Sequence, residues 1–260
     1  MLPGFQYPVY TCVCPQTKYT FDVRCLTVSE EDKILSSATF GYQMLHNINE
    51  ILYQCCVNKP DNIKTFDDFR KHVTQKDRDA LLYSLLQASD ADEQVLEVVC
   101  ASCRAKKTVK VKLSECFSAN MYPGAEGEIL QKEVPVTVQL GDYTGVFTLK
   151  VPTLERERQV LTYLGPKKVS ISMLTFLLTV HNAVLKQKDQ DVEKAESLSD
   201  LEVMLRSVPG KVGRKIRNVF NEEFGQYGMN LQYRYICDDC GSTNTHTIDL
   251  VEVLFRTVTE

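Results

Sequence analysis

The sequence predicts an α+β protein made of two copies of one unit, each with a β-hairpin, a helical middle and a second hairpin that carries a C-x-x-C motif. Two observations predict this duplication. Residues 9–35 align with residues 135–161 without a gap, and further matches follow in the same order. The motifs Cys100-Ala-Ser-Cys103 and Cys237-Asp-Asp-Cys240 then fall at corresponding places in the two halves. Ordered self-similarity of this kind is typical of an internal repeat.

The matches also suggest where the repeats begin and end. His46 and the asparagine after it correspond to His181 and its following asparagine. The offset between matched residues increases slowly along the chain, as loop insertions between retained elements would produce. We therefore expect a first repeat over residues 1–125 and a second over residues 126–260, with the join near residues 121–133.

Each repeat is expected to open with a β-hairpin. Alternating β-branched and aromatic residues around turn-forming residues are typical of strands. The first repeat shows this pattern at residues 7–14 and 19–25, separated by a Pro-Gln-Thr-Lys turn. The second repeat shows it at residues 135–140 and 146–151, separated by a Gly-Asp-Tyr turn.

A helix is expected after each opening hairpin. Thr27 and Glu30 have the spacing of a capping box, and Thr153 is a candidate N-cap in the second repeat. Ser199 and Glu202 repeat the capping-box spacing farther on. Helical periodicity predicts further helices at residues 66–88, 168–187 and 200–226.

The polar and charged stretch at residues 187–200 is the best linker candidate, and an exposed loop explains it equally well.

His46 and His181 both lie in helical patterns and lack a metal-binding or catalytic sequence context. We interpret both histidines as structural.

Each C-x-x-C pair is expected to occupy the turn of a hairpin, the arrangement called a zinc knuckle. Strand-like runs flank both pairs, at residues 94–99 and 108–113 in the first repeat and 230–236 and 243–250 in the second. One such turn supplies two thiolates, which is half of a closed tetrahedral zinc site. The sequence therefore predicts one structural zinc held by Cys100, Cys103, Cys237 and Cys240.

Other interpretations of the four cysteines remain open. Two separate or intermolecular sites, an iron–sulfur cluster and unliganded thiols all fit the same residues. Redox catalysis of the thioredoxin type is disfavoured, because its first cysteine opens a helix, whereas a strand-like run follows Cys103. Cys12 and Cys14 alternate on one expected strand face, and we interpret them as packing residues.

Composition narrows the function classes. The 260 residues are 43% hydrophobic and 25% charged with a net charge of −4, which fits a globular protein without a global basic field. No apolar run approaches the length needed to cross a bilayer, and the opening residues have no signal-peptide pattern. We therefore expect a soluble protein made in the cytosol, in which its ten cysteines are thiols or metal ligands.

One hairpin carries a basic face, formed by Lys106, Lys107, Lys110 and Lys112. Zinc ribbons that bind nucleic acid use such faces, so a zinc-ribbon nucleic-acid-binding factor is an alternative function. The acidic net charge and the confinement of the basic residues to one hairpin count against it. A glycine-rich phosphate loop, a nucleophile elbow and a locally paired set of catalytic carboxylates are all missing from the sequence, which favours a protein that is not an enzyme.

The chain resembles the baseplate-hub protein family of T4-like contractile-tailed phages. The resemblance begins with the hairpin and the Glu-Glu-Asp-Lys-Ile-Leu helix start at residues 7–35. It continues through the helix at residues 81–88, the Cys100 and Cys103 knuckle and residues 237–254. Cys25 departs from the family pattern, because an apolar residue without a thiol is more usual there.

The resemblance implies a structural component or assembly factor of the central baseplate hub. It implies partners among other baseplate and tail proteins, a place in the virion tail baseplate and assembly in the host cytoplasm. Neither a membrane span nor a small-molecule substrate is expected. The exposed edges of the two opening hairpins offer unpaired backbone groups to which a partner strand can add.

Overall fold

The computed structural model describes residues 7–36, 42–188 and 190–257, in which pairs of strands and groups of helices follow one another along the chain. The fold is α+β, as the sequence predicts. The first part of the chain contains β1 (Val9–Val13), β2 (Thr20–Arg24), α1 (Val28–Ser36), α2 (Tyr42–Cys55), β3 (Cys56–Asn58), α3 (Phe66–His72), α4 (Gln75–Ala88), β4 (Glu93–Val99), β5 (Lys106–Lys112), α5 (Leu113–Cys116), β6 (Phe117–Asn120) and η1 (Glu128–Leu130).

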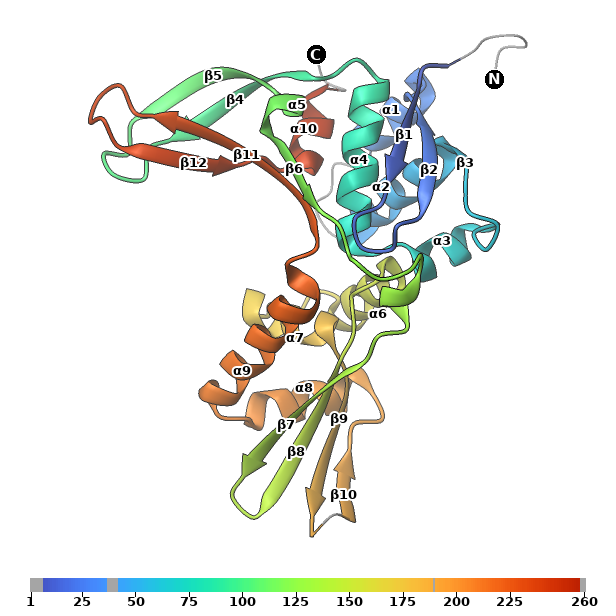
Figure 1. Cartoon of the computed structure of the whole chain (residues 1–260), viewed down its shortest axis with the longest axis vertical. Coiled ribbons are helices and arrows are strands. Elements are labelled where there is room, and N and C mark those ends of the chain that lie inside the picture. The colour runs from blue at the N-terminus through green and yellow to red at the C-terminus, as the bar shows by residue number, and fades with distance from the viewer. Residues whose placement is uncertain (1–6, 37–41, 189, 258–260) are drawn as a thin grey trace.

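The second part contains β7 (Val134–Leu140), β8 (Tyr143–Leu149), α6 (Leu154–Leu164), α7 (Ile171–Thr179), β9 (Val180–Gln187), β10 (Gln190–Lys194), α8 (Leu198–Ser207), α9 (Gly210–Phe220), the π-helical turn η2 (Asn221–Gly225), β11 (Gly228–Ile236), β12 (Thr243–Thr247) and α10 (Leu250–Thr257). Figure 1 shows two lobes, one above the other, and an arm of two long hairpins that projects sideways from the upper lobe.

The upper lobe is built on a small antiparallel sheet with the strand order β1-β2-β3. Helix α4 packs against β1 and β2. Its core contains Phe21, Leu52, Phe69 and Leu82, each of which is buried. The inward-facing side chains of β2 alternate with more exposed ones, as expected for a sheet that is covered on one face.

The lower lobe contains a four-stranded antiparallel sheet in the order β10-β9-β8-β7. Helices α7 and α8 contact β9, and α9 contacts β7. A two-residue turn at Gly141 and Asp142 joins β7 to β8, so strand β8 begins at Tyr143, a residue that the sequence pattern predicts in the turn. Gly141 has a φ of 63°, a backbone conformation that glycine adopts without strain.

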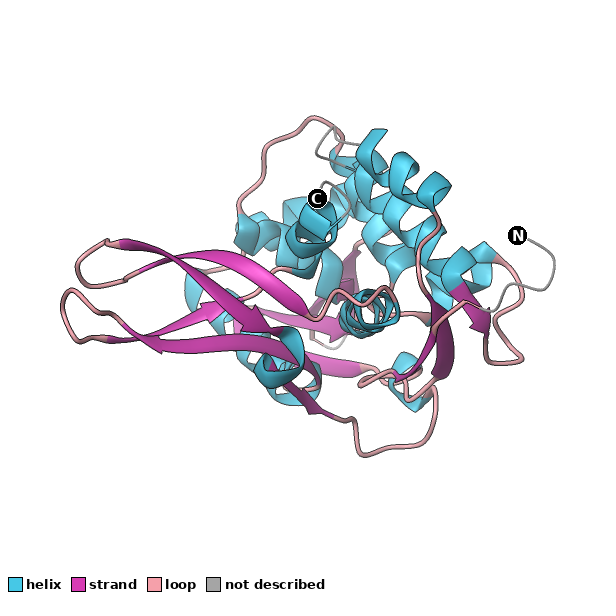
Figure 2. Ribbon diagram, turned by 90° about the horizontal axis from the view of Figure 1, so that it is seen from above, coloured by secondary structure: helices cyan, strands magenta, loops and turns pink. Residues whose placement is uncertain are grey.

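The end of the chain returns to the upper lobe. Met229 and Leu231 of β11 and Val253 and Leu254 of α10 join the buried cluster that surrounds the upper sheet. Strand β11 pairs with β12 along one part and with β6 along another. The hairpins β4-β5 and β11-β12 therefore project together, and their turns lie next to each other in both views (Figure 1 and Figure 2).

The predicted helix at residues 66–88 is two helices. Val73 and Thr74 separate α3 from α4, and the Thr74 side chain caps α4 by accepting a hydrogen bond from the Asp77 amide. A similar cap, Thr65 with Asp68, begins α3. Both caps have the threonine-x-x-aspartate spacing. The helical periodicity that runs through both segments conceals the break.

The predicted helix at residues 168–187 is also wrong in its second half. Helix α7 ends at Thr179, and the next residues form β9, which pairs with β8. His181 therefore lies in a strand rather than a helix. The apolar run around this point has no alternation to distinguish helix from strand, and pairing with β8 decides its conformation.

The predicted helix at residues 200–226 is divided as well. Val208 and Pro209 separate α8 from α9, since proline cannot continue a helix interior. The capping box of α8 is formed by Ser197 and Asp200, so the predicted box at Ser199 and Glu202 is wrong.

The linker predicted at residues 187–200 contains β10. All five residues of this strand are exposed, so the sequence carries no apolar alternation there. Pairing with β9 makes it a strand.

Within the described ranges, no helix combines the length and apolar character that crossing a membrane requires.

Candidate metal centre

The two C-x-x-C motifs form turns with the same hydrogen-bonding pattern. In each turn the amide of the first cysteine, Cys100 or Cys237, donates to the carbonyl five residues later at 2.9 Å. The carbonyl of the same cysteine accepts from the amide four residues later, that of Arg104 or Gly241. These two residues have φ values of 65° and 69°, so the backbone turns in the same sense in both motifs.

The turns bring the four predicted cysteines together. Cys100 Sγ lies 3.7 Å from Cys240 Sγ, and Cys103 Sγ lies 3.6 Å from Cys237 Sγ. All four sulfurs lie within 4.8 Å of one another. Ligands at 2.3 Å around one tetrahedral zinc would be separated by about 3.8 Å, so the arrangement fits a single ion.

The site is half-enclosed. Cys100 and Cys237, the first cysteine of each turn, are buried, whereas Cys103 and Cys240 are exposed. A metal ion held by all four would have the protein on one side and solvent on the other. Four thiolates complete a tetrahedral coordination sphere and leave no position for a substrate.

Asn244 of β12 supports the first turn from the second hairpin. Its Oδ1 accepts a hydrogen bond from the Ala101 amide at 2.9 Å, and its Nδ2 lies 3.5 Å from Cys100 Sγ. Such donors around a metal-bound sulfur orient the ligand and stabilise its charge. A salt bridge of 2.5 Å between Lys107 and Asp238 also connects the two hairpins.

Local donors adjust the acidity of the thiols. The backbone amide of Cys103 is the main group that lowers the pKa of Cys100, which is about 6. The Ser242 hydroxyl lowers the pKa of Cys240. The Ala105 amide lowers the pKa of Cys103, but the surrounding thiols and desolvation outweigh it and raise that pKa to about 12. Negative charge on one sulfur therefore opposes ionisation of another, and a bound cation would remove this conflict.

Both motifs lie in hairpin turns between strands, and neither begins a helix. The helix N-terminus that activates the first cysteine of a thioredoxin-type motif is therefore missing from both turns.

Of the four lysines on the predicted basic face, Lys106 pairs with Glu97 and Lys107 with Asp238. Lys110 and Lys112 form no ion pair within the described part of the chain.

The other candidates lie away from this centre. Cys12 and Cys14 are buried in the upper core, as expected for packing residues. His46 lies in α2 with its ring edge-on to Phe66, at 5.6 Å between ring centroids. Within the described ranges, the four knuckle cysteines form the only group of three or more such residues close enough to bind one ion.

Asn244 is a residue of the site that the sequence pattern does not predict. Asn244 is the buried residue of β12, but the next residue on the same face, His246, is also polar, so alternation along the strand gives no signal for it. Its two contacts depend on the position of the other hairpin, which the local sequence does not specify.

The sequence model of a family described as T4 bacteriophage base plate protein matches residues 7–256. Searches of curated proteins and of solved structures gave no significant match.

Proposed function

Since the chain belongs to the T4 bacteriophage base plate protein family, we propose that it is a structural component or an assembly factor of the central hub of the baseplate. The observation that carries this proposal is the extent of the match, which includes both lobes and both hairpins of the arm. The role requires stable folding and protein–protein contacts but no catalysis, and we propose that the protein is not an enzyme. The nucleic-acid-binding alternative gains no support from the family match.

The experiment is to locate the chain in baseplates purified from infected cells, by mass spectrometry and by electron microscopy. A hub component should be present in the complete baseplate and its density should lie near the central axis. An assembly factor should occur in hub intermediates and be lost from the finished particle. If the chain is missing from both preparations and binds DNA or RNA in a salt-sensitive manner, the hub proposal is wrong.

We also propose that the chain is a duplicated unit, with repeats at residues 1–125 and 126–260. The order of elements supports this division. Both parts contain a hairpin, two helices, a strand that pairs with the second strand of the hairpin, further helices and a C-x-x-C hairpin. The added strand is β3 in the first part and β9 in the second. Two related units in one chain offer two related surfaces to neighbouring subunits.

We propose that the four cysteines hold one structural zinc. The separations between the sulfurs support one ion, because a cluster would place several metal atoms between its ligands. The metal would connect the two hairpin turns and so stabilise the arm. When bound, it would supply no reactive position, because protein sulfurs fill its coordination sphere.

We propose that other baseplate and tail proteins add a strand to the opening hairpins, and that assembly takes place in the host cytoplasm. Strand β1 is at the edge of its sheet, and Val9, Tyr10 and Val13 are exposed. The amide of Val13 faces the free edge, because the next residue, Cys14, bonds to Tyr19 across the hairpin.

Val13→Pro removes that amide and should impair assembly in infected cells while the isolated protein remains folded. Val13→Ala, which shortens the side chain and keeps the amide, is the matched control. Normal assembly with Val13→Pro would count against this edge.

A further inference from the structure

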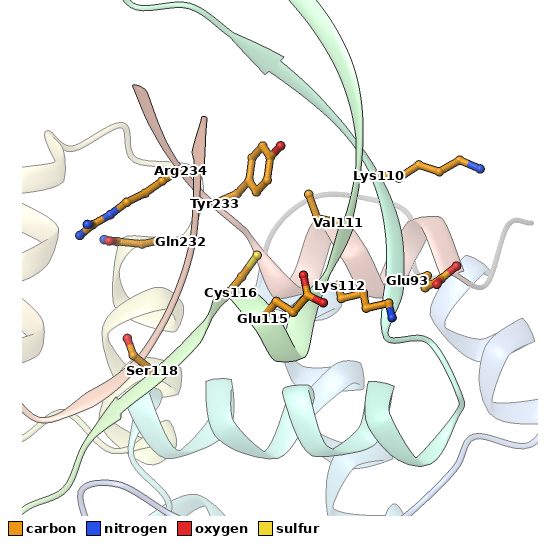
Figure 3. A pocket seen from close by; sticks show the side chains of 10 residues that line it. All are labelled: Glu93, Lys110, Val111, Lys112, Glu115, Cys116, Ser118, Gln232, Tyr233 and Arg234. Carbon is orange, nitrogen blue, oxygen red and sulfur yellow. The ribbon is translucent and has the colours of Figure 1, made fainter. Parts of the chain in front are cut away.

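A cavity of about 660 Å³ lies between the two hairpins of the arm. Residues 110–112 of β5 and residues 232–234 of β11 line it. Since successive side chains of a strand point to opposite faces, three consecutive residues can line one cavity only along the edge of their strand. Figure 3 shows Val111 and Tyr233 pointing toward each other across the cavity, with α5 at its base. The cavity therefore opens between two strand edges.

The edge of β5 that faces the cavity is unpaired. The sheet that contains β5 has two strands, and no strand of the described residues joins it on this side. Hydrogen bonds at both ends of the hairpin establish which backbone groups are free. Leu113 N donates to Asp92 O at the base, and Cys100 N donates to Ala105 O at the tip. Because inter-strand bonds alternate along an antiparallel pair, the even-numbered residues of β5 direct their N–H and C=O groups away from β4.

The two faces of β5 differ in chemistry. The even-numbered side chains, including Lys110 and Lys112, are exposed, whereas Val109 and Val111 are buried on the opposite face. A strand added beside β5 would share these faces. Every second side chain would lie next to the lysines, and the others would point toward Val111 and Tyr233.

The charged groups around the cavity favour an acidic occupant. Lys110, Lys112 and Arg234 line it, and none of them forms an ion pair within the described residues. Glu93 and Glu115 also line it. Glu93 lies directly opposite Lys112 in the register of the hairpin, on the side away from the free edge. The lining thus has an excess of positive charge, and both lysines belong to β5, the strand that has the free edge.

We propose that this cavity is a docking site for an extended segment of a partner protein in which apolar and acidic residues alternate. The segment adds to β5 as a third strand. Main-chain hydrogen bonds to the free edge supply affinity, and the alternation supplies specificity. This site is separate from the β1 edge proposed above, and its test does not depend on a role in the baseplate.

Strand β10 of a second copy of this chain could compete with a partner protein for the cavity. Strand β10 is an exposed edge strand in which Val192 lies between Asp191 and Glu193. If it occupied the cavity of a neighbouring copy, the chain would associate head to tail. The experiment below distinguishes this arrangement from a partner protein.

The probe is a fluorescently labelled peptide of alternating Glu and Val, about as long as β5. Fluorescence anisotropy at neutral pH and low salt measures its binding to the full-length protein. Lys110→Glu combined with Lys112→Glu should weaken binding by about tenfold or more, because two favourable charge contacts become unfavourable. The matched control is Lys64→Glu combined with Lys168→Glu, which makes the same change of charge at two exposed lysines outside the cavity.

Two further peptides keep the test decisive if the double variant does not fold. A peptide of alternating Lys and Val should bind about tenfold more weakly to the wild-type protein. The Glu-Val peptide with N-methylated backbone amides should also lose binding, because it cannot form main-chain hydrogen bonds. The proposal would be overturned if the Lys-Val peptide or the N-methylated peptide bound the wild-type protein as tightly as the Glu-Val peptide does. It would also be overturned if the control variant lost as much affinity for the Glu-Val peptide as the Lys110→Glu, Lys112→Glu variant. So would self-association of the wild-type protein that Asp191→Lys with Glu193→Lys abolishes in sedimentation experiments.

Discussion

Arg104 and Gly241 occupy the same position in the two knuckle turns, and both have a positive φ. Glycine adopts this conformation freely, whereas a residue with a Cβ is strained by about 1–2 kcal/mol. A Cβ at Gly241 would meet no atom within 4 Å. Gly241→Ala should therefore lower the free energy of unfolding by about 1 kcal/mol through backbone strain alone.

Arg104→Gly provides the opposite change at the equivalent position. It relieves the strain but adds chain entropy to the unfolded state, so stability should stay the same or increase by less than about 1 kcal/mol. Denaturant unfolding measures both variants. A loss of stability with Arg104→Gly as large as that with Gly241→Ala would show that the two turns are not equivalent.

The titration of His181 is expected to destabilise the protein in acid. Burial, and then the charges of Arg156 and Lys150, lower the pKa of His181 to about 3 in the folded protein. In the unfolded chain its pKa is about 6.5. The unfolded state therefore binds a proton that the folded state excludes, and the stabilisation present above pH 6.5 is lost as the pH falls toward 3. At pH 5 the loss is about 2 kcal/mol.

His181→Gln removes this titration. The free energy of unfolding of the variant should fall less steeply between pH 6.5 and 4 than that of the wild-type protein, and the difference over the interval should be about 3 kcal/mol. Chemical denaturation at a series of pH values measures the slope. Parallel curves for the two proteins would contradict the assignment.

The C-x-x-C spacing predicts that each pair of thiols shares one turn, whereas the correspondence between the two repeats predicts that the two pairs come together, as they do. Neither pattern predicts that Asn244 reaches the Ala101 amide. That contact depends on the angle between two hairpins whose turns are far apart in the sequence. Lys110 and Lys112 belong to the basic face that the sequence predicts, but the cavity beside them depends on the position of β11.

The two knuckle hairpins lie next to each other at their tips, and each supplies two of the four cysteines. Loss of a cysteine from either hairpin would therefore leave the proposed zinc site with three ligands. Cys100→Ser and Cys237→Ser should lower the free energy of unfolding by similar amounts, each more than about 2 kcal/mol, because binding of a structural metal contributes directly to folding. Elemental analysis should find one zinc per wild-type chain. A chelator should lower the melting temperature of the wild-type protein and leave both variants unchanged.

Cys25→Ser is the matched control, since Cys25 is partly buried and lies outside the cysteine cluster. It should keep both the metal and the response to chelator. Unequal losses for Cys100→Ser and Cys237→Ser, or zinc retained in only one of these variants, would indicate two separate sites.

Elements with a local signal were predicted well. The opening hairpins, the strands around both C-x-x-C motifs and the Thr153 cap are present in the structure. Strands β9 and β10 were missed for different reasons. Strand β9 continues an apolar run that also suits a helix, and β10 is polar throughout. Both are strands because of their neighbours in the sheet, and sequence periodicity does not record such pairing.

The sequence does not predict how the two lobes meet. The joint uses backbone and side-chain contacts between residues far apart in the chain. Gln75 N donates to Pro152 O at 3.1 Å, and Leu154 N donates to Val73 O at 3.0 Å. The side chain of Gln16 donates to the carbonyls of Phe224 and Tyr227. None of these contacts produces a periodic pattern, because each joins the ends of elements.

A buried ion pair lies at this joint, and we expect it to couple the unfolding of the two lobes. Arg78 of α4 and Glu157 of α6 are 2.6 Å apart, and about nine-tenths of each side chain is buried. Gln75 also donates to Glu157, at 2.6 Å. Glu157→Gln leaves the Arg78 charge buried without its partner, which should cost about 3–5 kcal/mol. Because the pair connects the two lobes, the loss should appear as weakened coupling between their unfolding transitions.

Differential scanning calorimetry tests this coupling. The wild-type protein should unfold in one transition, and Glu157→Gln should separate it into two or shift it to a clearly lower temperature. The matched control is Glu97→Gln, which removes the exposed ion pair with Lys106 and should change stability by less than about 1 kcal/mol. If Glu157→Gln changes stability as little as Glu97→Gln, the backbone contacts at Gln75 and Leu154 are sufficient to hold the lobes together. The ion pair would then fix the side chains at the joint without determining its strength.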